Sequence, residues 1–127
     1  MKIAAILIQN AIRILGLVLI ILGFLFWTGH SFALVPLHMR LGITLVVLLW
    51  VLSVLAIRAK VNPGLIVLSI GWGLLVAVFG MRMGAFLPGR SHEVIRVAHF
   101  LFGLIAIGLA ESLAARIKRS LPAVSRS

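Results

Sequence analysis

Four apolar stretches of about twenty residues constrain this chain more than any other feature of its sequence. They span approximately residues 3–27, 37–57, 61–81 and 94–117. A helix of this length crosses the ~30 Å hydrocarbon core of a bilayer, because an α-helix rises about 1.5 Å per residue. We therefore predict an all-α polytopic membrane protein, with a single transmembrane domain in residues 1–127 that ends in a basic cytoplasmic tail, residues 118–127.

Short connections join the four stretches. Consecutive helices are therefore expected to lie antiparallel beside one another, as a four-helix bundle in up-down-up-down order. The composition agrees, because 63% hydrophobic residues and only two acidic residues leave too little polar surface to cover a water-soluble globule. The absence of cysteine excludes disulfides, thiolate metal sites and iron–sulfur clusters.

Lysine and arginine are distributed unevenly between the two ends of the predicted helices. Eight fall at the end that carries both termini and four at the other end: Lys2, Arg13, Arg58, Lys60, Arg116, Lys118, Arg119 and Arg126 against Arg40, Arg82, Arg90 and Arg96. By the positive-inside rule both termini are cytoplasmic, and we expect a multi-pass protein of the bacterial inner membrane. The basic residues flank apolar stretches, so the net charge of +10 indicates membrane lipids with anionic headgroups, and not nucleic acid, as partners.

Two histidines stand in matching apolar settings. His38 and His99 are each followed, four residues on, by a glycine, which is Gly42 or Gly103. Positions i and i+4 share a helix face, so each imidazole would overlook bare backbone with room for a flat ligand. An ionisable residue inside a membrane is by default a functional-site candidate. The pair predicts one shared ligand, the alternative being two ordinary hydrogen-bonded side chains near the interface.

The ligand that fits this pattern is a single b-type haem (heme b) with His38 and His99 as axial ligands, since facing helices of a bundle can supply two neutral imidazoles. Arg40 and Arg96 are expected to bind the haem propionates through paired hydrogen bonds. Arg90 is a third arginine at the same interface. The residues expected at the edge of the macrocycle are aromatic: Trp50, Trp72, Phe100 and Phe102. This site predicts electron transfer at the outer leaflet.

His92 and Glu93 precede the second histidine of the pair. We predict them as catalytic residues that exchange protons with a quinone, because histidine titrates near neutral pH. The simpler interpretation of Glu93 is an exposed ion pair with Arg96, three residues on. His92 could also replace His99 as the axial ligand, because the seven residues between them make two helical turns.

Other functions stay open. Met39, Met81 and Met83 join the histidines at the outer end of the helices, and thioether plus imidazole suits copper(I), although methionine is more often packing filler. The chain could also be a non-catalytic accessory subunit of a larger membrane complex. Small residues drive helix association in lipid, so a homodimer could form through one of two glycine faces, Gly16 with Gly23 or Gly71 with Gly73. No hydrolase motif is present, and whether the protein is an enzyme is left open.

The two acidic residues have different settings. Glu111 lies toward the cytoplasmic end of the fourth stretch, and Arg13 lies at a similar depth in the first stretch. We predict a buried ion pair between them, because neither charge is stable alone in the membrane. A proton or cation carrier built on Glu111 is the functional alternative.

A weak internal repeat relates the two halves of the chain. Gly16 and Gly23 match Gly64 and Gly71, and the pair His38 with Gly42 matches the pair His99 with Gly103. This match predicts a tandem duplication of one helical hairpin, which would place the two histidines at similar depth around an axis along the membrane normal. The alternative is that segments rich in leucine, valine and glycine have aligned by chance.

Several short motifs together resemble a group of small bacterial four-helix membrane proteins that brings no established activity. The motifs are Phe26-Trp27-Thr28-Gly29, Leu37-His38-Met39, Leu87-Pro88-Gly89-Arg90-Ser91-His92, His99 and Ala106-Ile107-Gly108-Leu109-Ala110-Glu111. The ligand layout is similar to that of four-helix membrane b-type cytochromes, which bind haem between histidines and exchange electrons with quinones. Many of those carry two haems. Because this chain has no histidine in its cytoplasmic half, the resemblance implies one haem at most.

Overall fold

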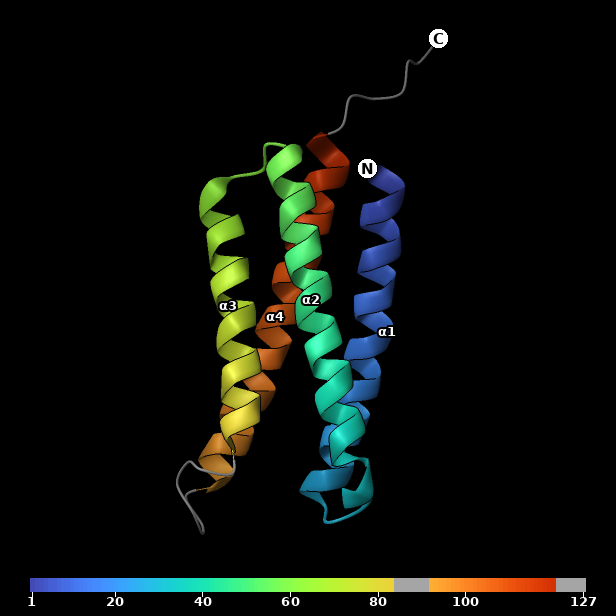
Figure 1. Cartoon of the computed structure of the whole chain (residues 1–127), viewed down its shortest axis with the longest axis vertical. Coiled ribbons are helices and arrows are strands. Elements are labelled where there is room, and N and C mark those ends of the chain that lie inside the picture. The colour runs from blue at the N-terminus through green and yellow to red at the C-terminus, as the bar shows by residue number, and fades with distance from the viewer. Residues whose placement is uncertain (84–91, 121–127) are drawn as a thin grey trace.

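The computed structural model describes residues 1–83 and 92–120. Within them the chain forms four helices, α1 (Lys2–Trp27), α2 (Val35–Arg58), α3 (Pro63–Arg82) and α4 (His92–Ser120), with a short 3-10 helix, η1 (Phe32–Leu34), leading into α2. The helices run up and down alternately, and both termini lie at the same end of the bundle (Figure 1). The predicted all-α four-helix bundle is therefore confirmed. Arg90 and the motif at residues 87–91 lie outside the described residues.

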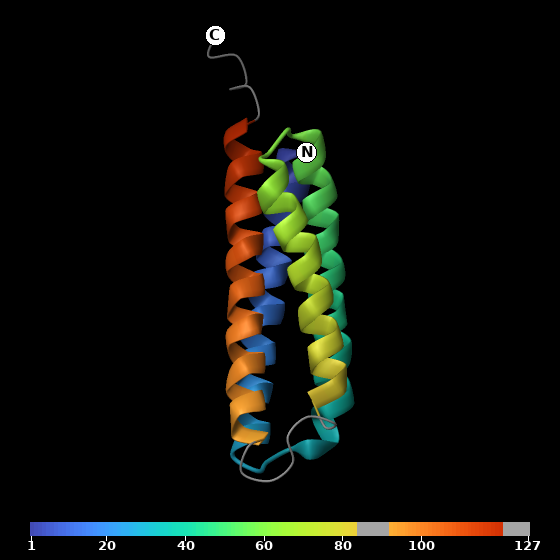
Figure 2. The ribbon, with the colours of Figure 1, turned by 90° about the vertical axis from the view of Figure 1, so that its left-hand side faces the viewer.

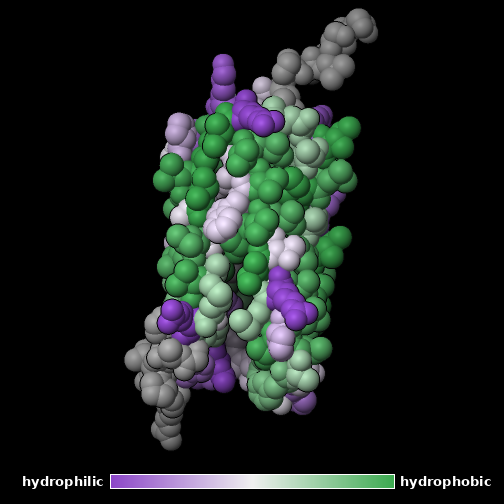
Figure 3. All heavy atoms as spheres, viewed as in Figure 1, coloured by the Kyte–Doolittle hydropathy of each residue, from purple (hydrophilic) through white to green (hydrophobic). Residues whose placement is uncertain are grey.

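Each of these four helices is long and apolar enough to cross a membrane. Their outward faces carry large hydrophobic side chains such as Leu7, Val67 and Leu101, which are 63%, 69% and 49% exposed. Hydrophobic residues cover most of the face seen in Figure 3, and the hydrophilic ones gather toward its two ends. The chain is a multi-pass membrane protein whose apolar outer surface suits lipid.

Most helix boundaries lie one to three residues from the expected ones, and two of these differences are informative. The third helix begins at Pro63 and not at 61, because Asn62 caps it by accepting a hydrogen bond from the backbone N–H of Gly64 (2.8 Å). Proline is favourable in the first helical turn, where its missing N–H has no intrahelical partner. The fourth helix continues to Ser120, so the first three residues of the predicted cytoplasmic tail are helical.

The packed core occupies the half of the bundle near the termini. Its fully buried members come from α1, α2 and α4: Ala5, Ile12, Leu49, Leu52, Ala56, Leu113, Ala114 and Ile117. In this half α2 also packs against α4 across the centre of the bundle. Figures 1 and 2 show the helices close together at the termini and spread apart toward the other end. The tight half therefore holds the fold together, and the other half is left open.

Two tryptophans connect neighbouring helices. Trp50 Nε1 donates to the carbonyl oxygen of Ile70 (3.1 Å), and Trp72 Nε1 donates to that of Phe102 (2.9 Å). These bonds link α2 to α3 and α3 to α4, and they satisfy indole N–H groups that would otherwise be unpaired in lipid. Trp50, Trp72 and Phe102 were expected at the edge of a bound macrocycle, but they take these packing roles and line no part of the cavity described next.

Candidate functional site

A cavity of about 510 Å³ opens between the four helices in the half of the bundle away from the termini. The physical cause is a set of residues with little or no side chain, contributed by all four helices: Gly16, Gly23, Gly42, Ala77, Gly80, Gly103 and Ala106. At most of these positions the short side chain leaves space between the helices, while Gly16 and Ala106 lie where the cavity borders the packed core. The face in Figure 3 is hollowed in its lower part, between the atoms of α3 and α2.

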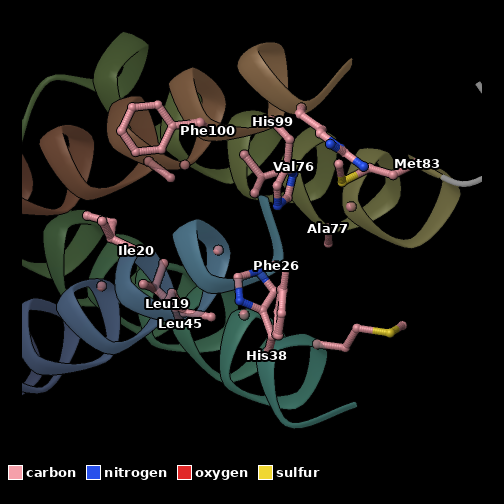
Figure 4. Close-up of a pocket in the computed structure, with 18 of the residues that line it drawn as sticks. Leu19, Ile20, Phe26, His38, Leu45, Val76, Ala77, Met83, His99 and Phe100 are labelled. Atoms are coloured by element: carbon pink, nitrogen blue, oxygen red, sulfur yellow. The ribbon is translucent and has the colours of Figure 1, made fainter. Parts of the chain in front are cut away.

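His38 on α2 and His99 on α4 face each other across this cavity (Figure 4). Their ring centroids are 6.3 Å apart and their planes differ by 55°. Within the described part of the chain, the Nδ1 atoms of both rings are buried without a hydrogen-bond partner. A buried polar atom without a partner is uncommon in a folded protein. Each imidazole therefore has an unmet bonding capacity in the interior of the bundle.

Each of these two rings lies over a glycine and beside a phenylalanine of the preceding helix. A Cβ atom at Gly23 would be 3.8 Å from His38 Cε1, and one at Gly80 would be 3.0 Å from His99 Cε1. The Phe26 ring meets His38 edge-on, with ring centroids 5.4 Å apart. The Phe79 ring stacks on His99, with centroids 6.2 Å apart and an interplanar angle of 8°. Each hairpin thus sets its histidine against a glycine and a phenylalanine of the preceding helix, although the ring contact is edge-on at His38 and stacked at His99.

This arrangement corrects the expected register of the repeat. The sequence match paired Gly23 with Gly71, but Gly71 is exposed on the outer face of α3 and meets no atom within 4 Å of an added Cβ. Gly80 takes the place that corresponds to Gly23. The spacing of residues along the chain could not reveal that Gly80 corresponds to Gly23. Each of these glycines contacts a histidine on the next helix, so the match depends on how the helices pack.

Gly42 and Gly103 both line the cavity, one turn beyond the histidines of their own helices. A Cβ atom at either position would meet nothing within 4 Å. The bare backbone expected at these two positions is therefore present, and it leaves open space beside each imidazole.

The carboxylate of Glu93 organises one side of the cavity entrance. Its Oε2 accepts a hydrogen bond from Trp27 Nε1 (2.9 Å), and its Oε1 accepts one from Arg96 Nη1 (2.7 Å). The predicted ion pair of Glu93 with Arg96 is thus confirmed. Glu93 ties the end of α1 to the start of α4 and orients an arginine that lines the cavity.

The remaining predicted site residues divide into two groups. His92, Arg96 and Phe100 line the cavity. Arg40 does not, because it follows His38 by two residues, and two helical steps of about 100° turn its side chain to the exposed outer face.

Three methionines also line the cavity, Met39 on α2, Met81 on α3 and Met83 just after it. Figure 4 shows Met83 on the same side of the cavity as His99. Among the described residues, no three His, Cys, Asp or Glu side chains gather closely enough to hold a metal ion. The polar side chains that line this cavity include the two facing imidazoles, His92 and Arg96.

A second polar site lies outside the cavity, where α1 meets α4. The predicted pair forms: Arg13 Nε donates to Glu111 Oε1 (2.6 Å) and Arg13 Nη2 to Glu111 Oε2 (2.9 Å). The expectation that it is buried is wrong, because the side chains are 54% and 35% exposed. Charge alone indicated which residues could pair across the two helices, and the packing of α1 on α4 leaves them on the outer surface.

Comparison of the chain with protein-family models, with curated proteins and with solved structures finds no match.

Proposed function

We propose that this protein is a b-type cytochrome-like electron carrier of the membrane, with one haem held between His38 and His99. The observation that carries the proposal is the pair of facing imidazoles, each with a buried nitrogen that has no partner among the described residues. Imidazoles on opposite sides of one iron are an established haem-binding arrangement.

The separation of the two rings supports this assignment. A metal–imidazole bond is about 2.0–2.1 Å long. A ring nitrogen lies about 1.1–1.2 Å from the centroid of a five-membered ring whose sides are about 1.33 Å. Two imidazoles that each point one nitrogen at a metal between them therefore have centroids about 6.2–6.6 Å apart. The separation of the His38 and His99 centroids, 6.3 Å, is compatible with this range.

The surroundings favour a haem over a bare metal ion. Two imidazoles are too few to complete the coordination of most transition metals, and a porphyrin brings four further nitrogens with it. The open backbone at Gly42 and Gly103 gives a planar ligand room beside each ring. The cavity volume of 510 Å³ lies within the range of about 300–1,000 Å³ typical of small-molecule sites. Arg96, at the entrance, can donate to a propionate.

Bound haem would supply one-electron chemistry, and the chain's own residues would hold and insulate it. Apolar lining residues such as Phe26, Val76 and Phe100 exclude water from the site. We propose a quinone as the electron partner, since the cavity lies between membrane-spanning helices, and His92 with Glu93 as the groups that exchange its protons. The charge bias toward the termini supports cytoplasmic termini in a bacterial inner membrane, and with that orientation this site would lie in the outer leaflet.

The decisive measurement is the absorption spectrum of the detergent-purified protein, supplied with haem during expression, before and after reduction with dithionite. We expect a Soret band, with sharp α and β bands on reduction, which are lost in His38→Ala and His99→Ala. His30→Ala is the matched control, because His30 is exposed and lies outside the cavity. A protein that stays colourless after haem is supplied would contradict the proposal.

Copper(I) binding is the second candidate, favoured by the three methionines that line the same cavity. Metal analysis after exposure to copper(I) separates the two functions. Copper retention lost in Met81→Leu and Met83→Leu, without any haem spectrum, would assign a copper site. If the purified protein binds neither haem nor copper and co-purifies with large membrane proteins, it would be assigned as an accessory subunit of a larger complex.

A further inference from the structure

A cluster of polar side chains lies on the outside of the bundle, along the line where α1 packs against α4. We call it the α1/α4 polar cluster, and its members are Gln9, Asn10, Arg13, Glu111 and Lys118. Arg13 is eleven residues from the start of α1, which puts it about 16 Å along the helix and close to its midpoint. The cluster therefore reaches the depth of the lipid chains.

The charges inside the cluster are paired. Arg13 donates twice to Glu111, and Gln9 Nε2 donates to Glu111 Oε2 (2.6 Å). Lys118 Nζ in turn donates to Gln9 Oε1 (2.8 Å). These bonds satisfy the carboxylate but only part of the guanidinium, which has five N–H groups.

The outer side of the cluster is open. The side chain of Arg13 is 54% exposed, and Asn10 is exposed beside it. Arg13 Nη1 donates to Asn10 Oδ1 at 3.3 Å. This bond uses the oxygen of the Asn10 amide and not its two N–H groups. Donors that face hydrocarbon at this depth are costly, so a membrane protein covers them with another polar surface.

The adjoining surface of α4 permits another helix to approach closely. Gly108 and Ser112 are exposed and four residues apart, so they lie on one face, next to Glu111. A Cβ atom at Gly108 would meet nothing within 4 Å. Small residues at this spacing let two helices come close enough for backbone contact in lipid.

We propose that a second copy of this chain covers the α1/α4 polar cluster, related to the first copy by a two-fold axis that lies in the interface and runs along the membrane normal. A two-fold interface must be complementary to itself. The cluster meets this condition because it carries an acid and a base side by side, and its amides both donate and accept. A lipid headgroup does not fit, since Arg13 lies near the midpoint of its helix and headgroups lie at the interface.

This face replaces the two glycine faces expected from the sequence. Gly16 packs against Ile107, Gly23 lies under His38, and Gly73 packs against Trp50, so three of the four glycines are used inside the bundle. The proposal is independent of the haem, because none of the cluster residues lines the cavity.

The test uses single cysteines, which the natural sequence lacks. Gly108→Cys and Ser112→Cys would be oxidised in native membranes and scored for disulfide-linked dimers. Leu74→Cys and Gly71→Cys are the controls, because both positions are exposed on α3 at about the same distance from the terminal end of the bundle. We expect dimers only with the two α4 variants. Equal cross-linking at all four positions, or none at the α4 positions, would overturn the proposal.

A second measurement keeps the test independent of cysteine chemistry. Light scattering in detergent is expected to give twice the 13.8 kDa protein mass of one chain. Gly108→Leu should reduce it to a single chain without changing the helix content, because the added side chain points outward. A single-chain mass for the unaltered protein would refute the assignment of a second copy. In the cross-linking experiment, a different protein linked to residue 112 would refute it as well.

Discussion

The imidazole of His99 lies directly over the backbone of Gly80. A Cβ atom at position 80 would be 3.0 Å from His99 Cε1, whereas the equivalent Cβ at Gly23 would be a relaxed 3.8 Å from His38 Cε1. Each histidine packs against a glycine of the preceding helix, but the space for an added methyl group is smaller at Gly80 than at Gly23. Alanine substitutions at these two glycines therefore form a matched pair of variants.

Gly80→Ala should displace His99 and weaken the site, while Gly23→Ala should not. Overpacking of this kind costs about 1–3 kcal/mol, which corresponds to a loss of haem affinity of about fivefold to 150-fold if the whole cost falls on the bound state. Haem titration followed by the Soret band measures the effect. Equal affinities of the two variants would show that the contact of His99 with Gly80 does not position the ligand.

Gly42→Leu and Gly103→Leu should abolish haem binding without unfolding the bundle. Each added side chain would occupy the open space that a planar ligand needs beside its histidine. The ratio of Soret to protein absorbance reports the loss, and circular dichroism reports the fold. Gly71→Leu, on the exposed face of α3, serves as the control and should keep its haem. Full haem content in both cavity variants would contradict the assignment of the cavity as the ligand site.

Arg96→Leu should lower haem affinity, while Arg40→Leu should leave it unchanged. Arg96 lines the cavity and Arg40 faces outward. A hydrogen bond to a charged group contributes about 1.5–3 kcal/mol, so its loss corresponds to about tenfold or more in affinity. Losing a neighbouring cation should also lower the haem midpoint potential, because a positive charge favours the reduced iron. Redox titration of both variants checks this, and an equal shift in the two would exclude a specific role for Arg96.

Gly73→Ala should destabilise the bundle, while Gly71→Ala should not. A Cβ atom at Gly73 would be 2.8 Å from Trp50 Nε1, which is already held by its bond to Ile70. The clash should cost about 1–3 kcal/mol of unfolding free energy. At exposed Gly71 the change to alanine should be neutral or stabilising by up to about 1 kcal/mol, through helix propensity. Denaturant unfolding in detergent measures both, and a stable Gly73→Ala protein would refute the close packing of α2 on α3.

The helices and their order follow from local features of the chain. An apolar stretch of about twenty residues that crosses a bilayer can satisfy its whole backbone within itself by forming a helix, which is why such stretches predict helices. Local chemistry then sets the ends, as Asn62 and Pro63 do for α3. The two histidines could also be singled out, since an ionisable group in such a stretch is exceptional whatever it packs against.

The contacts between groups on different helices could not be predicted from local features. The seating of His99 on Gly80, the outward turn of Arg40 and the packing role of Trp50 all depend on the rotation of each helix about its axis. In lipid that rotation is set by side-chain packing between helices, because nearly every face of such a helix is apolar and the hydrophobic pattern does not distinguish inside from outside. The ion pair of Arg13 with Glu111 also depends on helix rotation. Charge alone indicated that these two residues pair, but the packing of α1 on α4 determines how far the pair is exposed.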